Sequence, residues 1–183
     1  MPKKSSLTRF KTNSGGSTQL SYGWSHNAAD SIVRGLMQVY NITEDQTSYK
    51  HKRGLAWCKE RIIKIPNKFE TPYHFLVAIH EISHITCMDK RKNKPYEHDY
   101  IREYETEVAT IKLAKGLNII PIDHLTYYIE DSKKYVLAHL LEEFSRHKSD
   151  KFKLRYDTLK WIGIKEEQLH NEYDNLVKIV NTK

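Results

Sequence analysis

Two histidines with three residues between them, His80 and His84, are the side chains of this sequence whose type and spacing best suit chemistry. In a helix, side chains at this spacing lie one above the other on one face, so both imidazoles can reach one metal ion. Glu81 projects about 100° around the helix from His80, beside the metal and not onto it. Its carboxylate can therefore take a proton from water at the metal, which is the general-base role in zinc peptidases. The alternative interpretation is an ordinary amphipathic helix with surface histidines.

A catalytic zinc site usually has three protein ligands, so a further element must supply the third. The helix expected over residues 101–115 carries Glu103, Glu105 and Glu107. Glu103 and Glu107 lie one turn apart on the same face, whereas Glu105 points elsewhere. We expect Glu107 to be the ligand, because it enters the apolar half of the helix and a carboxylate among buried positions needs a partner such as Zn²⁺. Glu103 and Glu105 stay open as ligands, and a solvated charge run is the competing explanation.

His98, in the loop that follows the motif helix, is another candidate for the third ligand. The metzincin continuation of the motif is missing, since Cys87 stands at its glycine position and Lys90 at its ligand position. A histidine ligand would therefore have to come from this loop. His98 would then complete a site of three histidines.

The elements that position these residues can be predicted from periodicity and turn chemistry. Apolar spacing predicts a helix over residues 27–40. Short strands are expected at residues 46–51, 55–58 and 61–65. Thr71-Pro72 supplies an N-cap and a first-turn proline, so the helix that carries the motif begins there. The sequence predicts an α+β fold with a small three-stranded sheet packed on the motif helix and on the glutamate-bearing helix.

The chain divides into three predicted parts. Residues 1–23 are rich in Ser, Thr, Gly and Lys, and we expect a flexible basic arm. Residues 24–120 form the predicted metallopeptidase core. Residues 121–183 hold no motif that predicts chemistry, and we expect a helical extension packed on the core. In that extension, Asp131-Ser132 is expected to cap a helix, and further helices are expected beyond residue 153.

Composition and charge indicate in which compartment the protein works and what it can bind. No window approaches 18 consecutive apolar residues and residues 1–10 lack an apolar signal region, so we expect a cytoplasmic protein without a membrane segment. Cys58 and Cys87 are too few for a disulfide framework. The net charge of +7 gathers in clusters near residues 50–64 and 90–94. Such surfaces attract nucleic acids, although a solvated face is their commoner explanation.

Several sequence segments together resemble the zincin domains of ImmA/IrrE metallopeptidases and the C-terminal domain of ArdC-type antirestriction proteins. The segments are, in order, Gly54-Leu-Ala56, Arg61-Ile-Ile-Lys-Ile65-Pro66, His80-Glu-Ile-Ser-His84, Glu105-Thr-Glu107-Val-Ala109 and Leu117-Asn-Ile119. The resemblance covers roughly residues 27–120. It implies a zincin-like fold, with His80, His84 and Glu107 as zinc ligands and Glu81 as the base. The chain departs from the ImmA-like pattern after Glu107, where Val108-Ala109-Thr110-Ile111 replaces Ala-Asn-x-Phe.

The resemblance implies a zinc-dependent metallopeptidase that hydrolyses a protein substrate. ImmA-like enzymes cut a repressor, so the resemblance also implies a DNA-associated substrate in a phage or mobile element. A SprT-like site, with a histidine as the third ligand, depends on His98. The alternative function is a nucleic-acid-binding antirestriction module that keeps a zincin scaffold without turnover. Metal content and the salt dependence of single-strand binding distinguish the two.

Overall fold

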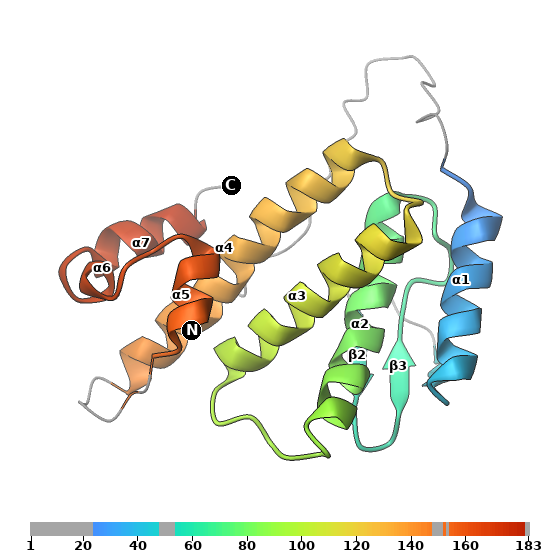
Figure 1. Cartoon of the computed structure of the whole chain (residues 1–183), viewed down its shortest axis with the longest axis horizontal. Coiled ribbons are helices and arrows are strands. Elements are labelled where there is room, and N and C mark those ends of the chain that lie inside the picture. The colour runs from blue at the N-terminus through green and yellow to red at the C-terminus, as the bar shows by residue number, and fades with distance from the viewer. Residues whose placement is uncertain (1–23, 48–53, 148–151, 153, 182–183) are drawn as a thin grey trace. The chain divides into compact units, whose positions relative to one another are not determined.

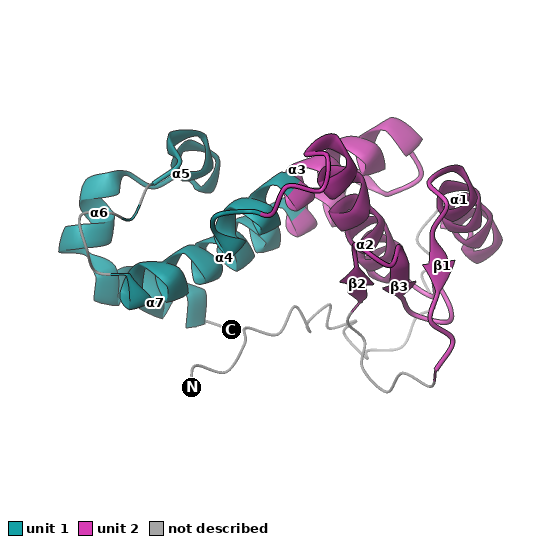
Figure 2. Cartoon of the chain, turned by 90° about the horizontal axis from the view of Figure 1, so that it is seen from below, with its two compact units in different colours: residues 1–7, 96–105, 129–183 teal, residues 8–95, 106–128 magenta. Residues whose placement is uncertain are grey.

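The computed structural model describes residues 24–47, 54–147, 152 and 154–181 (Figure 1). The basic arm expected at residues 1–23 lies outside these ranges. The described chain divides into two compact units, which are coloured separately in Figure 2. We call residues 24–95 and 106–128 the histidine unit, and residues 96–105 and 129–181 the helical unit. Two long helices, α3 (Asp99–Leu117) and α4 (Ile122–Arg146), each belong in part to both units.

The histidine unit begins with α1, His26–Val39, close to the predicted helix. The side chain of its N-cap, Ser25, accepts a hydrogen bond of 3.3 Å from the Ala28 N–H, which satisfies a donor that the first turn leaves open. The helix buries Ala29, Val33 and Met37, which lie one turn apart on one face.

A small mixed sheet follows, with the strand order β1-β3-β2. The strands are β1 (Thr43–Glu44), β2 (Leu55–Trp57) and β3 (Ile62–Lys64). β3 pairs with β1 in parallel and with β2 in the antiparallel direction. The second and third strands lie where the sequence predicts them. β1 was not predicted, and most of the strand expected at residues 46–51 lies outside the described residues. Of that segment, Gln46 and Thr47 are described and lie outside a strand, where Asp45 accepts the Thr47 N–H at 2.9 Å in a turn.

The motif helix is α2, Pro72–Lys90, and it begins as predicted. Thr71 is its N-cap and accepts a hydrogen bond of 3.3 Å from the His74 N–H, with Pro72 in the first turn. α2 packs against β2, β3 and α1 (Figure 1). The fully buried side chains that join these elements are Val33, Ile63, Phe75, Ala78, Ile79, Ile82 and Ile85. A helix buried on several sides at once gives its polar residues rigid positions.

The glutamate-bearing helix is α3, Asp99–Leu117, which Figure 2 colours in part as each unit. It is followed by α4 (Ile122–Arg146), α5 (Tyr156–Ile162), α6 (Glu166–Asn171) and α7 (Tyr173–Asn181). α4 begins directly after Pro121 and not at Asp131-Ser132, and Ser132 is fully buried within it. A serine inside a helix resembles a cap in sequence, which explains the misplaced start.

The helical unit has its own apolar core. Its buried members are Tyr100, Leu137, Leu140, Leu141, Leu159, Leu169 and Leu176. Gly163 ends α5 with φ +88°, in the left-handed region that favours glycine.

The described elements make an α+β structure in which helices dominate and the sheet is small, as the sequence predicts. No helix among the described residues is both long and apolar enough to cross a membrane.

Candidate metal site

The site is built first on α2, where His80 and His84 lie one turn apart. Their ring centroids are 4.6 Å apart and their planes are nearly perpendicular, at 88°. Glu81 is buried, with only 6% of its surface exposed, beside this pair on the same helix. The predicted spacing therefore does bring two imidazoles and a carboxylate into one small region.

One side chain of α3 lies close to Nδ1 of each imidazole. Glu107 Oε1 lies 3.2 Å from His80 Nδ1, and the Glu107 side chain is 1% exposed. Thr106 Oγ1 lies 3.0 Å from His84 Nδ1. A partner at Nδ1 restrains the orientation of a histidine ring, and where Nδ1 donates its proton to that partner, Nε2 is left to bind a metal. Sequence reasoning missed Thr106, because a single threonine next to three glutamates gives no signal of its own.

Glu103 completes a group of mutually close ligand atoms. One ligand atom each from His80, His84 and Glu103 lie within 4.8 Å of one another, and among the described residues this is the group that could hold a metal ion. Glu103 lies one turn before Glu107 on the same face of α3, as the sequence predicts, and is 3% exposed. Whether Glu107 also serves as a ligand stays a prediction. Its carboxylate contacts Nδ1 of His80.

Arg102 accompanies the Glu103 carboxylate. Arg102 Nε and one terminal nitrogen donate to Glu103 Oε1 at 3.2 and 3.0 Å. Burial lowers the pKa of Arg102, but the charges of Glu103 and Asp99 outweigh it, so the pKa of the guanidinium lies above its ordinary value. The arginine is therefore cationic at any physiological pH and places a positive charge beside the Glu103 carboxylate.

The other two ligand candidates have partners within the helical unit. Glu105 accepts from Tyr96 Oη at 2.9 Å and also from Arg155. His98 Nδ1 lies 2.8 Å from Glu143 Oε2, and its ring contacts Phe152 with centroids 4.8 Å apart. Neither residue belongs to the metal-ligand group found in the described part of the chain. Glu105 thus points away from the histidines, as predicted.

The residues present fit a zinc ion. Two histidines and one carboxylate are a known catalytic donor set, and zinc bonds of about 2.0–2.2 Å put tetrahedral ligand atoms roughly 3.4 Å apart. A group already within 4.8 Å reaches that spacing by small side-chain rotations. One carboxylate and two neutral imidazoles also leave a net positive charge on the ion, which suits chemistry at an open position.

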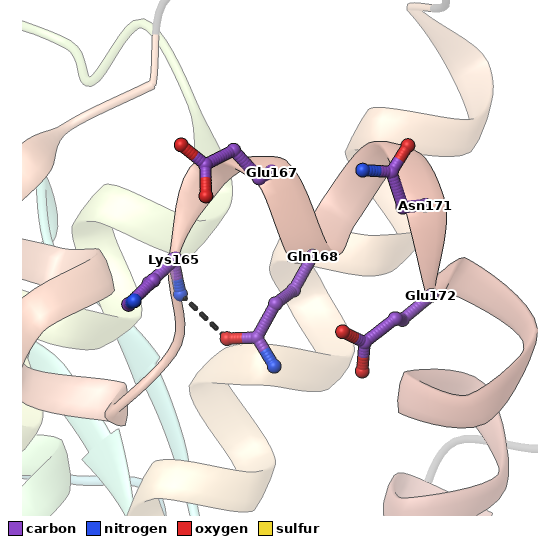
Figure 3. Close-up of a pocket in the computed structure, with 5 residues that line it drawn as sticks. All are labelled: Lys165, Glu167, Gln168, Asn171 and Glu172. Carbon is purple, nitrogen blue, oxygen red and sulfur yellow. Dashed lines mark hydrogen bonds between the residues drawn. The ribbon is translucent and has the colours of Figure 1, made fainter.

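The hollows found elsewhere on the described surface do not contain the residues of the metal-ligand group. One of about 370 Å³ lies on α6 and is lined by Lys165, Glu167, Gln168, Asn171 and Glu172 (Figure 3). The dashed line in Figure 3 is the hydrogen bond of 2.9 Å from the Lys165 N–H to Gln168 Oε1. That contact caps the helix, and the lining is typical of a solvated surface.

Comparisons with known proteins return nothing for this chain. No family model, no curated protein and no solved structure matches it. The assignment of the candidate metal site therefore depends only on the geometry of its residues.

Proposed function

We propose that this chain is a zinc-dependent metallopeptidase whose metal is held by His80, His84 and Glu103. The observation that supports it most is the grouping of these three ligand atoms within 4.8 Å of one another. Two of them come from α2, the helix that also carries Glu81, and the third comes from α3. When bound, zinc supplies a Lewis acid that polarises a carbonyl and lowers the pKa of water towards ~7. We propose Nε2 of each histidine as the metal-binding atom, because Nδ1 of His80 lies near Glu107 and Nδ1 of His84 lies near Thr106.

Glu81 is the proposed general base. Its carboxylate takes a proton from the attacking water and delivers it to the leaving amine as the peptide C–N bond breaks. Burial suits this role, because a carboxylate with little water around it holds a defined position and is a stronger hydrogen-bond acceptor. Because Glu81 follows His80 directly, the stiffness of α2 keeps the base beside the ligands.

The sheet supports an extended peptide as the substrate. β2 is an outer strand in the order β1-β3-β2, and its Leu55 and Trp57 side chains are 47% and 40% exposed. An outer strand offers backbone N–H and C=O groups, with which an extended peptide can pair as an added strand. The exposed Leu55 and Trp57 side chains would then contact apolar residues of that peptide. A repressor or another DNA-associated protein is the substrate that we propose from the sequence resemblance.

The test is cleavage of a peptide library by the zinc-loaded full chain, with new termini identified by mass spectrometry. We expect cleavage by the wild type and none by Glu81→Gln, which keeps the shape of the side chain but removes its basicity. Cleavage that persists equally in Glu81→Gln would overturn the assignment of the base. No cleavage by the wild type, together with salt-dependent binding of single-stranded nucleic acid, would favour the antirestriction-type alternative.

A further inference from the structure

We infer that Gly54 is a positioning residue that sets where the Glu81 carboxylate lies. Gly54 immediately precedes β2, whereas Glu81 lies on α2, and the two belong to the same unit. This inference deepens the proposed function, since it concerns the base of that site. Neither the motif nor the ligand group identifies it.

The contact is very close. A Cβ atom added to Gly54 would lie 2.3 Å from Glu81 Cγ, 2.3 Å from Oε1 and 2.6 Å from Cδ. Real Cβ atoms essentially never approach a heavy atom below 3.0 Å, so three consecutive atoms of the glutamate would have to move. The Glu81 side chain therefore lies directly against Gly54, whose backbone forms one wall beside it.

Space, and not backbone conformation, is what requires glycine here. Among the described glycines, only Gly163 adopts a positive φ. Gly54 thus has a backbone that other residues can adopt, and what it provides is the missing side chain. By contrast, an added Cβ at Gly35 or Gly116 would meet nothing within 4 Å.

A glutamate pressed between α2 and this backbone cannot easily find a second position. Glu81 is 6% exposed, and its helix is held by a core that includes Ile79 and Ile82, both fully buried. A methyl group at residue 54 would rotate the carboxylate away, and misplacement of a catalytic group by about 1 Å can cost around 100-fold in rate. The two histidine ligands project from α2 in another direction and, like Glu103 on α3, would keep their positions.

The test begins with a double-mutant cycle on thermal unfolding, which needs no activity. Gly54→Ala in the wild-type background should lower the unfolding midpoint by roughly 5 °C through overpacking. In the Glu81→Ala background the same change should cost little, because the colliding atoms are gone. Gly35→Ala and Gly116→Ala are matched controls that should cost nothing in either background. An equal loss in both backgrounds would overturn the inference.

If Gly54→Ala alone does not fold, the double variant Gly54→Ala/Glu81→Ala decides. A folded double variant supports the contact, and an unfolded one contradicts it. The second measurement is zinc content and steady-state cleavage by Gly54→Ala. We expect one zinc per chain, an unchanged KM and a kcat about 100-fold lower.

Full kcat in Gly54→Ala would overturn the positioning role. A failed peptidase assay in the wild type would instead overturn the proposed function. The unfolding cycle would still decide whether Gly54 places Glu81.

Discussion

Glu107 Oε1 lies 3.2 Å from His80 Nδ1, on the side of the ring that a metal bound at Nε2 would not occupy. One turn earlier on α3, Glu103 joins the two histidines in the ligand group. The two buried glutamates of one helix face therefore have different proposed tasks. One binds the ion, and the other orients a ligand that binds it.

Zinc affinity should separate these tasks. Glu103→Ala should reduce zinc affinity as much as His80→Ala or His84→Ala does, because each removes a ligand. Glu107→Ala should weaken zinc by about 10–100-fold, the usual cost of losing a partner behind a ligand. Glu105→Ala is the control on the same helix and should change little. If Glu107→Ala loses the metal while Glu103→Ala keeps it, Glu107 is the third ligand.

Thr106 should act on zinc through His84. Thr106→Val keeps the shape of the side chain but removes the hydroxyl that lies 3.0 Å from His84 Nδ1, so we expect zinc affinity to fall by about 10-fold. Thr110→Val is a matched control, because Thr110 is equally buried on α3 but donates to the Thr106 carbonyl oxygen at 2.8 Å. Titration of both variants with zinc under one buffer measures the difference. Equal affinities would remove Thr106 from the site.

His98 should matter for stability and not for zinc. Its Nδ1 pairs with Glu143, which also accepts the Tyr100 N–H at 2.9 Å, so His98→Ala removes one partner of a buried carboxylate. We expect a loss of about 1–3 kcal/mol in the free energy of unfolding and an unchanged zinc affinity. Denaturant unfolding and zinc titration of one preparation give both values. Loss of zinc from His98→Ala would instead support a SprT-like site with a third histidine.

Tyr100 should make the protein sensitive to alkali. Burial raises the pKa of Tyr100 from 10.0 to about 12. Between these two values the unfolded chain releases the phenol proton while the folded chain keeps it. The contribution of Tyr100 to the free energy of unfolding is therefore fully present below pH 10 and is lost as the pH rises towards 12. Tyr100→Phe should flatten this decline, measured as unfolding free energy between about pH 9 and pH 11.

The same Tyr100→Phe variant should also cost about 1 kcal/mol at neutral pH, because the phenol oxygen accepts the Arg155 N–H at 3.0 Å. A variant that loses stability with pH exactly as the wild type does would contradict the assignment of the alkaline step to Tyr100.

The sequence was sufficient where local chemistry decides the structure. Thr71-Pro72 predicted the start of α2, and the spacing of His80 and His84 predicted their shared face. Ser132 was misleading, because a serine buried in the middle of α4 has the sequence appearance of a cap. A long helix held by tertiary packing overrides such a local signal.

The contacts within the site could not be predicted in the same way. The choice between Glu103 and Glu107 depends on how far α3 is shifted along α2, and both residues share one face of α3. Gly54 and Glu81 are 27 residues apart in the sequence, and no periodicity predicts that they approach each other. Such contacts arise from the packing of one element on another, which a single sequence does not reveal.

The metal content of purified full-length protein tests the central claim most directly. Wild type, His80→Ala and Glu81→Gln would be equilibrated with zinc, freed of excess metal and analysed by mass spectrometry for zinc per chain. We predict about one zinc in the wild type and in Glu81→Gln, and almost none in His80→Ala, since only the histidine is a ligand. A wild type without zinc, or a His80→Ala protein that keeps a full zinc ion, would contradict the account.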